Sequence, residues 1–277
     1  MTEDELLDYE HLLPLDRYIL HCLALHCKQV VELYEEFYFN KVVLKTQFFV
    51  ASTLSAFYFS LVKDRLYCDL MESQERKSAN TVMFYVLKNL QASISPILPI
   101  LCREVFLHSS IQQNPTDAST FLYQYISTDR WIDERLKNET ELLIGLKETI
   151  RQNIVGSSET VNEISSKDLN KLELLIIPLC NDTVSALSKF GTSGIKELFQ
   201  VSQVQIFYSE SELYKNVALL DMEPYIKIKE NNFIIYIITS KHKMCPRCRL
   251  YSCSRLDDED TLCDRCQHVI KKTEIVL

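Results

Sequence analysis

Four cysteines near the end of the sequence stand in two closely spaced pairs. Cys245 and Cys248 form the first C-x-x-C pair, and Cys263 and Cys266 form the second after fourteen intervening residues. Each tight C-x-x-C turn can direct two thiolates at one point, and four thiolates complete the tetrahedral shell that Zn²⁺ accepts. The spacing therefore predicts a ribbon that holds one zinc ion. Because four cysteines close the shell and leave no position for a water, we expect this zinc to be structural rather than catalytic.

Two other uses of these four cysteines stay open. They could form two disulfides, or two redox-active C-x-x-C pairs. Redox-active pairs normally lie at a strand-to-helix junction of a βαβ unit, and no such unit is predicted here. Disulfides are typical of secreted proteins, and no secretory signal opens the sequence. Cys253 is a fifth thiol in the same region, and we expect it to be a bystander rather than a ligand.

Positive charges gather around the first cysteine pair, and no acid lies among residues 241–256. They are Lys241, Lys243, Arg247, Arg249 and Arg255. These side chains could hold the phosphates of a nucleic acid, or they could offset the charge of a zinc tetrathiolate and stay solvated. The alternation of this stretch with the acidic run 257–260 does not decide between the two.

The bulk composition limits how the chain can bind nucleic acid. Its 277 residues are 47% hydrophobic, with a net charge of −8 and a pI near 5.4. An acidic chain of this kind does not coat nucleic acid through its overall field, so any affinity must come from local basic patches. With only 4 glycines, the sequence has no glycine-rich phosphate loop. No apolar run approaches the roughly 18 to 20 residues of a membrane span, so we expect a soluble chain with no membrane contact.

Long helices are predicted for the first half of the chain, because apolar residues recur there at three- and four-residue steps. The predicted helices cover residues 12–37, 40–67, 74–95, 99–106 and 127–156. Asn40 and Ser73 can cap the second and third helices, and Pro99 suits the first turn of the fourth. The aromatic side chains of the second helix are predicted to lie in the core; they are Phe48, Phe49, Phe57 and Phe59.

The pattern changes after residue 156. A short apolar run at 172–178, alternation at 201–208, and two strand-like runs at 225–228 and 233–238 predict a small α+β unit, with a helix that ends at Phe190. The predicted fold class is therefore mainly α: a helical bundle, a small α+β junction unit and a C-terminal four-cysteine zinc ribbon. The predicted domains are residues 1–156, 157–240 and 241–277.

Several motifs resemble one known family. In the first half they read Leu15-Asp16-Arg17-Tyr18-Ile19, Tyr34-Glu35-Glu36-Phe37-Tyr38-Phe39-Asn40, Phe57-Tyr58, Lys63-Asp64-Arg65-Leu66-Tyr67 and Ser95-Pro96-Ile97-Leu98. Together they resemble the helical anticodon-binding domain of class I isoleucyl-tRNA synthetases. The run Val201-Ser202-Gln203-Val204 is similar to the junction region of that family. The cysteine pairs look like the zinc module that ends its bacterial and mitochondrial members, so the resemblance covers essentially the whole chain.

The resemblance implies that the chain recognises isoleucine tRNA. The bundle would hold the anticodon stem, the ribbon would contact the anticodon loop, and a catalytic domain of the same enzyme would receive the acceptor end. Candidate contacts are Lys63, Arg65, Trp131, Arg151, Arg247 and Arg249. Simpler explanations exist for several of them: Arg65 can pair with Asp69, Trp131 can anchor the core, and Arg151 can complement a helix dipole.

The sequence departs from the family in two ways. The catalytic signatures His-Ile-Gly-His and Lys-Met-Ser-Lys-Ser and the editing domain are absent from these residues. We therefore expect the chain to be inactive alone, whether as a fragment of a longer ATP-binding enzyme, an incomplete gene model or a stand-alone tRNA-binding relic. Directly after Cys248, Arg249 stands where the family commonly has an aromatic residue, although a guanidinium can also stack on a base.

The resemblance also bears on compartment and partners. It implies a mitochondrial location if the source is eukaryotic, a cytoplasmic one if it is bacterial, and a monomer. The alternative function is a zinc-ribbon adaptor that binds protein, which the acidic pI and the acidic run 257–260 would favour. A glycosylase-type enzyme is a weaker alternative for two reasons: the four-cysteine shell is closed, and no group of catalytic acid and base residues accompanies it.

Overall fold

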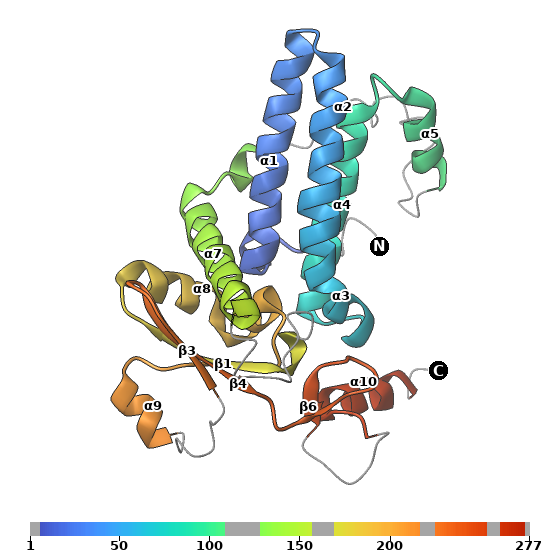
Figure 1. Cartoon of the computed structure of the whole chain (residues 1–277). Helices are drawn as coiled ribbons and strands as arrows, with labels where there is room; N and C mark the ends of the chain where they lie inside the picture. Colours follow the sequence, from blue (N-terminus) through green and yellow to red (C-terminus); the bar gives the residue numbers. More distant parts are fainter. Residues whose placement is uncertain (1–5, 109–127, 157–168, 217–224, 254–260, 275–277) are drawn as a thin grey trace. The chain divides into compact units, whose positions relative to one another are not determined.

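The computed structural model describes residues 6–108, 128–156, 169–216, 225–253 and 261–274 (Figure 1). The chain divides into two compact units, residues 1–134 and 135–277. The first is helical, and the second combines helices with strands. The mainly α fold class, with a small sheet and a C-terminal cysteine cluster, is confirmed. The division into three domains at residues 156 and 240 stays a prediction.

Unit 1 is a bundle of antiparallel helices (Figure 1). Its longest elements are α1 (Pro14–Glu35), the continuous run of α2 (Phe39–Phe48), η3 (Phe49–Tyr58) and α3 (Phe59–Cys68), and α4 (Gln74–Ile94). The shorter helices η2 (Tyr9–His11), α5 (Pro99–His108) and η5 (Asp129–Trp131) complete its described part. Helix α1 packs against both α2 and α4.

Local sequence signals explain where these helices begin. Pro14 occupies the first turn of α1, where its missing N–H removes no helical hydrogen bond. The Ser73 hydroxyl accepts a hydrogen bond from the Arg76 N–H at 3.2 Å, so the predicted cap of α4 is confirmed. The predicted cap at Asn40 is wrong, because α2 begins at Phe39 and its N-cap residue is Tyr38. The turn between α1 and α2 instead uses Phe37 in a left-handed conformation, with φ of 61°.

The middle of the long helix has π geometry over the ten residues of η3. Such segments are rare, and their hydrogen bonds span one residue more than those of an α-helix. By length and composition, the 30-residue helix Phe39–Cys68 could cross a membrane, so the expectation that no segment approaches a membrane span is wrong. Core helices of soluble proteins can be equally long and apolar, but they are mostly buried. In this helix only 28% of the most apolar 18-residue stretch is buried. Much of its apolar surface is therefore exposed.

The core of unit 1 forms where α1, η3, α3 and α4 meet. Trp131 is fully buried there, with its ring 4.9 Å from that of Tyr85. Trp131 lies in the short helix η5, and the predicted helix that includes it begins only at Glu134, as α7. The predicted start of that helix, Ser127, lies outside the described residues. Phe49 is buried and Phe57 half-buried, whereas Phe48 is 67% exposed. The prediction that Phe48 lies in the core is therefore wrong.

A buried carboxylate joins four helical segments of this core: α1, η3, α3 and α4. Asp16 of α1 is fully buried, and the Arg65 guanidinium donates to both of its oxygens, at 2.8 and 3.0 Å. The Tyr58 hydroxyl donates to the same carboxylate at 2.8 Å, and the Ser78 hydroxyl donates to it as well. Ser78 in turn accepts a hydrogen bond from the N–H of Leu13 at 3.0 Å. Charge and hydrogen-bonding capacity of Asp16 are thus satisfied by protein groups.

Unit 2 contains a four-stranded sheet in the order β2-β1-β4-β3. Its strands are β1 (Leu172–Pro178), β2 (Gln203–Ile206), β3 (Tyr225–Lys229) and β4 (Phe233–Thr239). Strand β1 pairs parallel with β2 and antiparallel with β4, and β3 and β4 form the predicted hairpin. Most residues of β1 and β4 are buried, which explains why β4 is apolar over most of its length and β1 is interrupted only by the half-buried Glu173.

Helices α7 (Glu134–Gly156), α8 (Asn181–Phe199) and α9 (Glu210–Asn216) accompany this sheet. The Glu139 carboxylate of α7 pairs with Lys189 of α8. The Lys147 ammonium donates to the Leu198 carbonyl at 2.8 Å, which satisfies one orphan carbonyl at the end of α8. Helical geometry breaks at Gly191, where φ is 62°, directly after the predicted helix end at Phe190, and a second helical stretch of α8 then continues to Phe199.

Candidate metal centre and nucleic-acid interface

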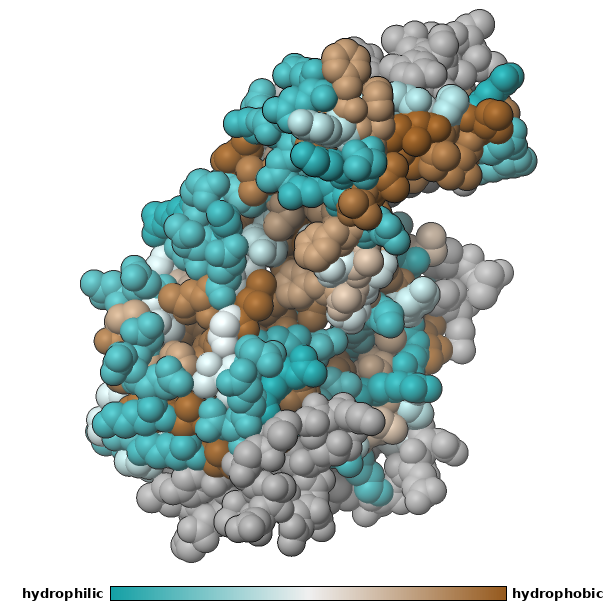
Figure 2. All heavy atoms as spheres, turned by 45° about the horizontal axis from the view of Figure 1, so that its top comes forward, coloured by the Kyte–Doolittle hydropathy of each residue, from teal (hydrophilic) through white to brown (hydrophobic). Residues whose placement is uncertain are grey.

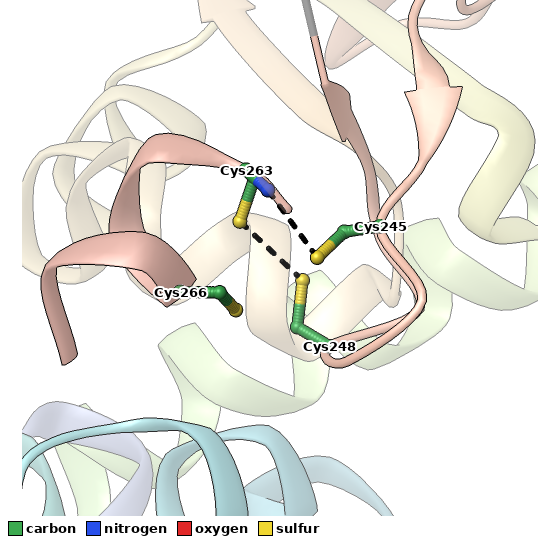
Figure 3. Close-up of side chains that lie close together, drawn as sticks. All are labelled: Cys245, Cys248, Cys263 and Cys266. Carbon is green, nitrogen blue, oxygen red and sulfur yellow. Dashed lines mark hydrogen bonds between the residues drawn. The ribbon is translucent and has the colours of Figure 1, made fainter. Parts of the chain in front are cut away.

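The four paired cysteines converge in unit 2 (Figure 3). The sulfur atoms of Cys245, Cys248, Cys263 and Cys266 all lie within 4.8 Å of one another. Cys245 and Cys266 are fully buried, and the sulfurs of Cys248 and Cys263 are 3.8 Å apart. Four sulfurs that each bind one ion at about 2.3 Å in tetrahedral geometry would be separated by a similar distance. The cluster could therefore bind a metal ion without a large rearrangement.

Two short elements aim these thiols at one point. Cys245 follows the two-residue strand β5 (Lys243–Met244), which pairs with β6 (Tyr251–Cys253). The N–H of Arg249 donates to the Cys245 carbonyl at 2.8 Å, and Arg249 has a left-handed φ of 59°. This tight turn brings Cys248 beside Cys245.

The second pair stands at the start of helix α10 (Asp264–Glu274). Cys263 directly precedes the helix, and its carbonyl accepts a hydrogen bond from the N–H of Gln267 at 3.0 Å. Cys266 lies within the first turn, so both sulfurs leave the same helix end. The N–H of Cys263 also donates to the Cys245 sulfur at 3.4 Å, which links the two halves of the cluster.

The thiols differ in acidity. Burial raises the pKa of Cys245, but hydrogen bonds from the backbone N–H groups of Cys263, Cys248 and Arg247 outweigh it and lower the pKa to about 6. Burial, together with negative charge on its neighbours, raises the pKa of Cys248, and burial raises that of Cys266 to about 11. Cys248 and Cys266 must therefore release their thiol protons when a metal ion binds, because the ion binds the thiolate form.

The fifth thiol of this region lies beside the group of four but is not part of it. Cys253 is buried beside the cluster, and its sulfur donates to the Thr261 carbonyl at 3.2 Å. It does not belong to the group of four whose sulfurs converge. A shell that four cysteines complete offers no open coordination position, so the arrangement suits a structural ion and not a catalytic one.

The candidate RNA contacts divide into exposed and buried groups. Lys63, Arg151 and Arg249 are exposed, and Arg247 is half-buried. Arg65 is 5% exposed and binds the Asp16 carboxylate, and Trp131 is fully buried against Tyr85. The predictions that Arg65 and Trp131 touch tRNA are therefore corrected, because neither side chain reaches the surface.

The structure adds two lysines to the basic side chains of the ribbon. Lys271 and Lys272 are exposed in the last turns of α10, the helix that carries Cys266. In the sequence they are visible only as a pair of adjacent lysines. They are not among the basic residues that surround the first cysteine pair, because they lie beyond the acidic run 257–260. Exposed lysines at a helix C-terminus also complement its dipole, so this doublet has a structural role besides any contact with RNA.

Comparison with known proteins assigns this architecture. The family described as the anticodon-binding domain of tRNA ligase matches residues 16–171, more than half of the chain. The mitochondrial isoleucine–tRNA ligase of Macaca fascicularis is 30% identical over 264 residues, which cover 92% of this chain and 26% of that protein. The isoleucine–tRNA ligase of the bacterium Fervidobacterium nodosum is 26% identical over 279 residues, which cover 98% of this chain and 28% of that protein.

The chain thus spans about a quarter of the length of the curated relatives that it matches. The mitochondrial isoleucine–tRNA ligase of Schizosaccharomyces pombe shows the same proportions, with 30% identity over 95% of this chain and 27% of the relative. These matches do not favour a zinc-ribbon adaptor. The chain belongs to the family of anticodon-binding domains of tRNA ligases, and it corresponds to the C-terminal anticodon-binding part of isoleucine–tRNA ligases.

Proposed function

We propose that this chain binds isoleucine tRNA at the anticodon stem and loop, as the recognition part of an isoleucine–tRNA ligase. The observation that carries this proposal is the family match over residues 16–171, together with isoleucine–tRNA ligases that align with nearly the whole chain. The aminoacylation itself would require a catalytic domain with the nucleotide-binding signatures that these residues lack.

The residues that we propose to contact tRNA are Lys63 in unit 1 and Arg151, Arg247 and Arg249 in unit 2. All four are cationic and at least partly exposed, so they can approach phosphates. Arg249 stands on the turn that follows two candidate metal ligands, where a guanidinium could stack on an unpaired base. An acidic chain with net charge −8 needs such local patches to bind RNA.

The ion that suits the cysteine cluster best is Zn²⁺. Four thiolates in a closed tetrahedral shell are typical of structural zinc sites. In this role Cys245, Cys248, Cys263 and Cys266 would hold the β5–β6 turn against α10, and so keep Arg247 and Arg249 in place. If the source is eukaryotic, we propose a mitochondrial location, since several of the relatives are mitochondrial enzymes; in a bacterium it would be cytoplasmic.

A filter-binding titration tests tRNA recognition. Isoleucine tRNA should bind more tightly than a matched tRNA whose anticodon has been exchanged, and the logarithm of the affinity should fall linearly with the logarithm of the salt concentration. The Arg249→Ala variant should weaken binding, whereas alanine at Lys215, an exposed cation of α9 that is not among the proposed contacts, serves as a charge control. Equal affinity for both tRNAs would argue against reading of the anticodon.

A further inference from the structure

A groove in unit 1 lies outside the residues that we propose for tRNA. It runs between the C-terminal half of α1 and helix α2. Eight residues line it: Gln29, Glu32, Leu33, Glu36, Lys41, Leu44, Lys45 and Phe48. The residues from each helix stand at steps of three and four, so each helix contributes one continuous face. Figure 2 shows apolar side chains exposed at this end of the bundle.

The floor of the groove is apolar and open to solvent. Leu44 is 63% exposed and Phe48 is 67% exposed, with Leu33 half-buried beside them. A contiguous exposed apolar surface of this kind marks an interaction site more often than an isolated exposed leucine does.

The two rims of the groove carry opposite charges. Exposed Glu32 and Glu36 lie along the α1 side, and exposed Lys41 and Lys45 lie along the α2 side. A helix in the groove would therefore match it best with an apolar face, a basic edge toward α1 and an acidic edge toward α2. This arrangement also fixes the direction of the helix, because a reversed helix would place like charges together.

The charges disfavour other occupants. The carboxylates of Glu32 and Glu36 repel RNA phosphates, and the ring of Tyr38, an exposed aromatic nearby, already packs against the Lys41 ammonium at 3.7 Å. A bilayer would leave the acidic rim without partners in an apolar medium. We propose that this groove binds an amphipathic helix of a partner protein, in the helix-in-groove mode.

A synthetic peptide tests the proposal. The probe is a fluorescein-labelled helical peptide of about 18 residues, with leucines on one face, lysines along one edge and glutamates along the other. Its fluorescence anisotropy should rise saturably when the full chain is added. Leu44→Glu and Phe48→Glu should each weaken binding by at least about tenfold, the loss expected for a charged group in place of a central apolar anchor.

Val43→Glu is the matched control. Val43 is on the same helix and 46% exposed, but it does not line the groove, so this variant should bind the peptide as the unaltered chain does. Circular dichroism of each variant checks that the bundle is folded. A compensation experiment uses the charges of the rims. The double variant K41E/K45E has two acidic rims, so it should bind the original peptide more weakly and should bind more tightly a peptide with lysines on both edges.

Four outcomes would overturn the proposal. They are no saturable binding of the peptide, binding that survives both Leu44→Glu and Phe48→Glu, a dimer in sedimentation velocity that Leu44→Glu dissociates, and binding of tRNA or of phosphatidylcholine–phosphatidylglycerol vesicles that Leu44→Glu abolishes. The last two would assign the groove to a second copy of the chain, to RNA or to a membrane surface.

Discussion

At the scale of single residues, the buried carboxylate of Asp16 gives a physical meaning to several family-like motifs. Asp16, Tyr58 and Arg65 belong to three motifs that are separate in the sequence, and all three meet in one hydrogen-bonded group. A buried ion pair contributes little net stability over apolar packing, but it is costly to break because one charge then stays buried alone. These residue types therefore specify how the helices pair.

Replacing Asp16 by alanine should strand the Arg65 guanidinium in the core. We expect the free energy of unfolding of unit 1 to fall by about 3 to 5 kcal/mol, the usual cost of breaking a buried pair. Urea unfolding followed by Trp131 fluorescence measures this, since the chain has one tryptophan and it lies in the same core. Lys63→Ala, two residues from Arg65 and exposed, should change stability by less than about 0.5 kcal/mol. Similar losses in both variants would contradict the role of the pair.

His26 should make the bundle sensitive to acid. Burial, with a smaller contribution from the charge of Lys45, lowers the pKa of His26 from its ordinary value to about 4. Because the folded chain resists protonation more than the unfolded chain does, this stability is complete above pH about 6.5 and is lost as the pH falls toward 4. The loss should reach about 3 kcal/mol, the equivalent of the pKa change.

Unfolding of the chain and of His26→Leu at several pH values measures this loss. The difference in unfolding free energy between them should change across that window, since leucine cannot take up the proton. The imidazole stacks on Phe49 with a centroid distance of 4.7 Å, so the variant also loses some packing, but that loss does not depend on pH. Parallel pH curves for the two proteins would rule out His26 as the cause.

At the scale of elements, the sequence predicts the regular parts well. The helices at 12–37, 74–95 and 99–106 and the strands at 172–178 and 233–238 all form close to their predicted bounds, because their periodicity and caps are local signals. The cysteine spacing likewise predicts a cluster whose four sulfurs converge.

Tertiary context decides what local signals do not. The predicted cap at Asn40 fails because the left-handed Phe37 lets the helix begin earlier, at Phe39. Phe48 has the type and spacing of a core residue, yet it faces the groove beside α1. Arg65 reads as a surface cation, and only the fold shows that Asp16 lies opposite it. Periodicity gives the face of a helix and not what covers that face.

Two glycines of α8 should respond oppositely to alanine. Gly191 has φ of 62° and ψ of 174°, a conformation nearly confined to glycine, so Gly191→Ala should destabilise unit 2 by about 1 to 3 kcal/mol. Nothing lies within 4 Å of the added methyl group, so the cost comes from the backbone alone.

Gly194→Ala is the comparison for that variant. Its methyl group would meet the Phe190 side chain at an ordinary 3.5 Å, and alanine favours the helix, so stability should rise by up to about 1 kcal/mol. Thermal unfolding followed by circular dichroism distinguishes the two variants. An unchanged Gly191→Ala would show that the kink does not depend on glycine, and a destabilised Gly194→Ala would contradict the prediction that a methyl group fits beside Phe190.

At the scale of the whole molecule, the two compact units have different reporters. Trp131 lies in unit 1, and the cysteine cluster lies in unit 2. Tryptophan fluorescence therefore follows unit 1, whereas metal content concerns unit 2.

Removing the metal should therefore affect one unit only. We expect the chain to carry one zinc per molecule. A chelator should lower the melting temperature of unit 2 in calorimetry, because an ion that binds only the folded ribbon stabilises it. Trp131 fluorescence should stay unchanged. Cys266→Ser should behave like the chelated protein. Cys253→Ser should keep its zinc, since that sulfur lies outside the group of four. Loss of zinc in Cys253→Ser would contradict the four-cysteine shell.

The Asp16 group also sets an order of events during protein synthesis. Asp16 leaves the ribosome before its partner Ser78, which is 62 residues further along the chain. At about 5 to 20 residues per second, that separation lasts roughly 3 to 12 s. During this interval the carboxylate of Asp16 lacks at least one of its partners in the folded bundle. The hydrogen-bonded group that joins these helices can therefore be completed only after α4 has been made.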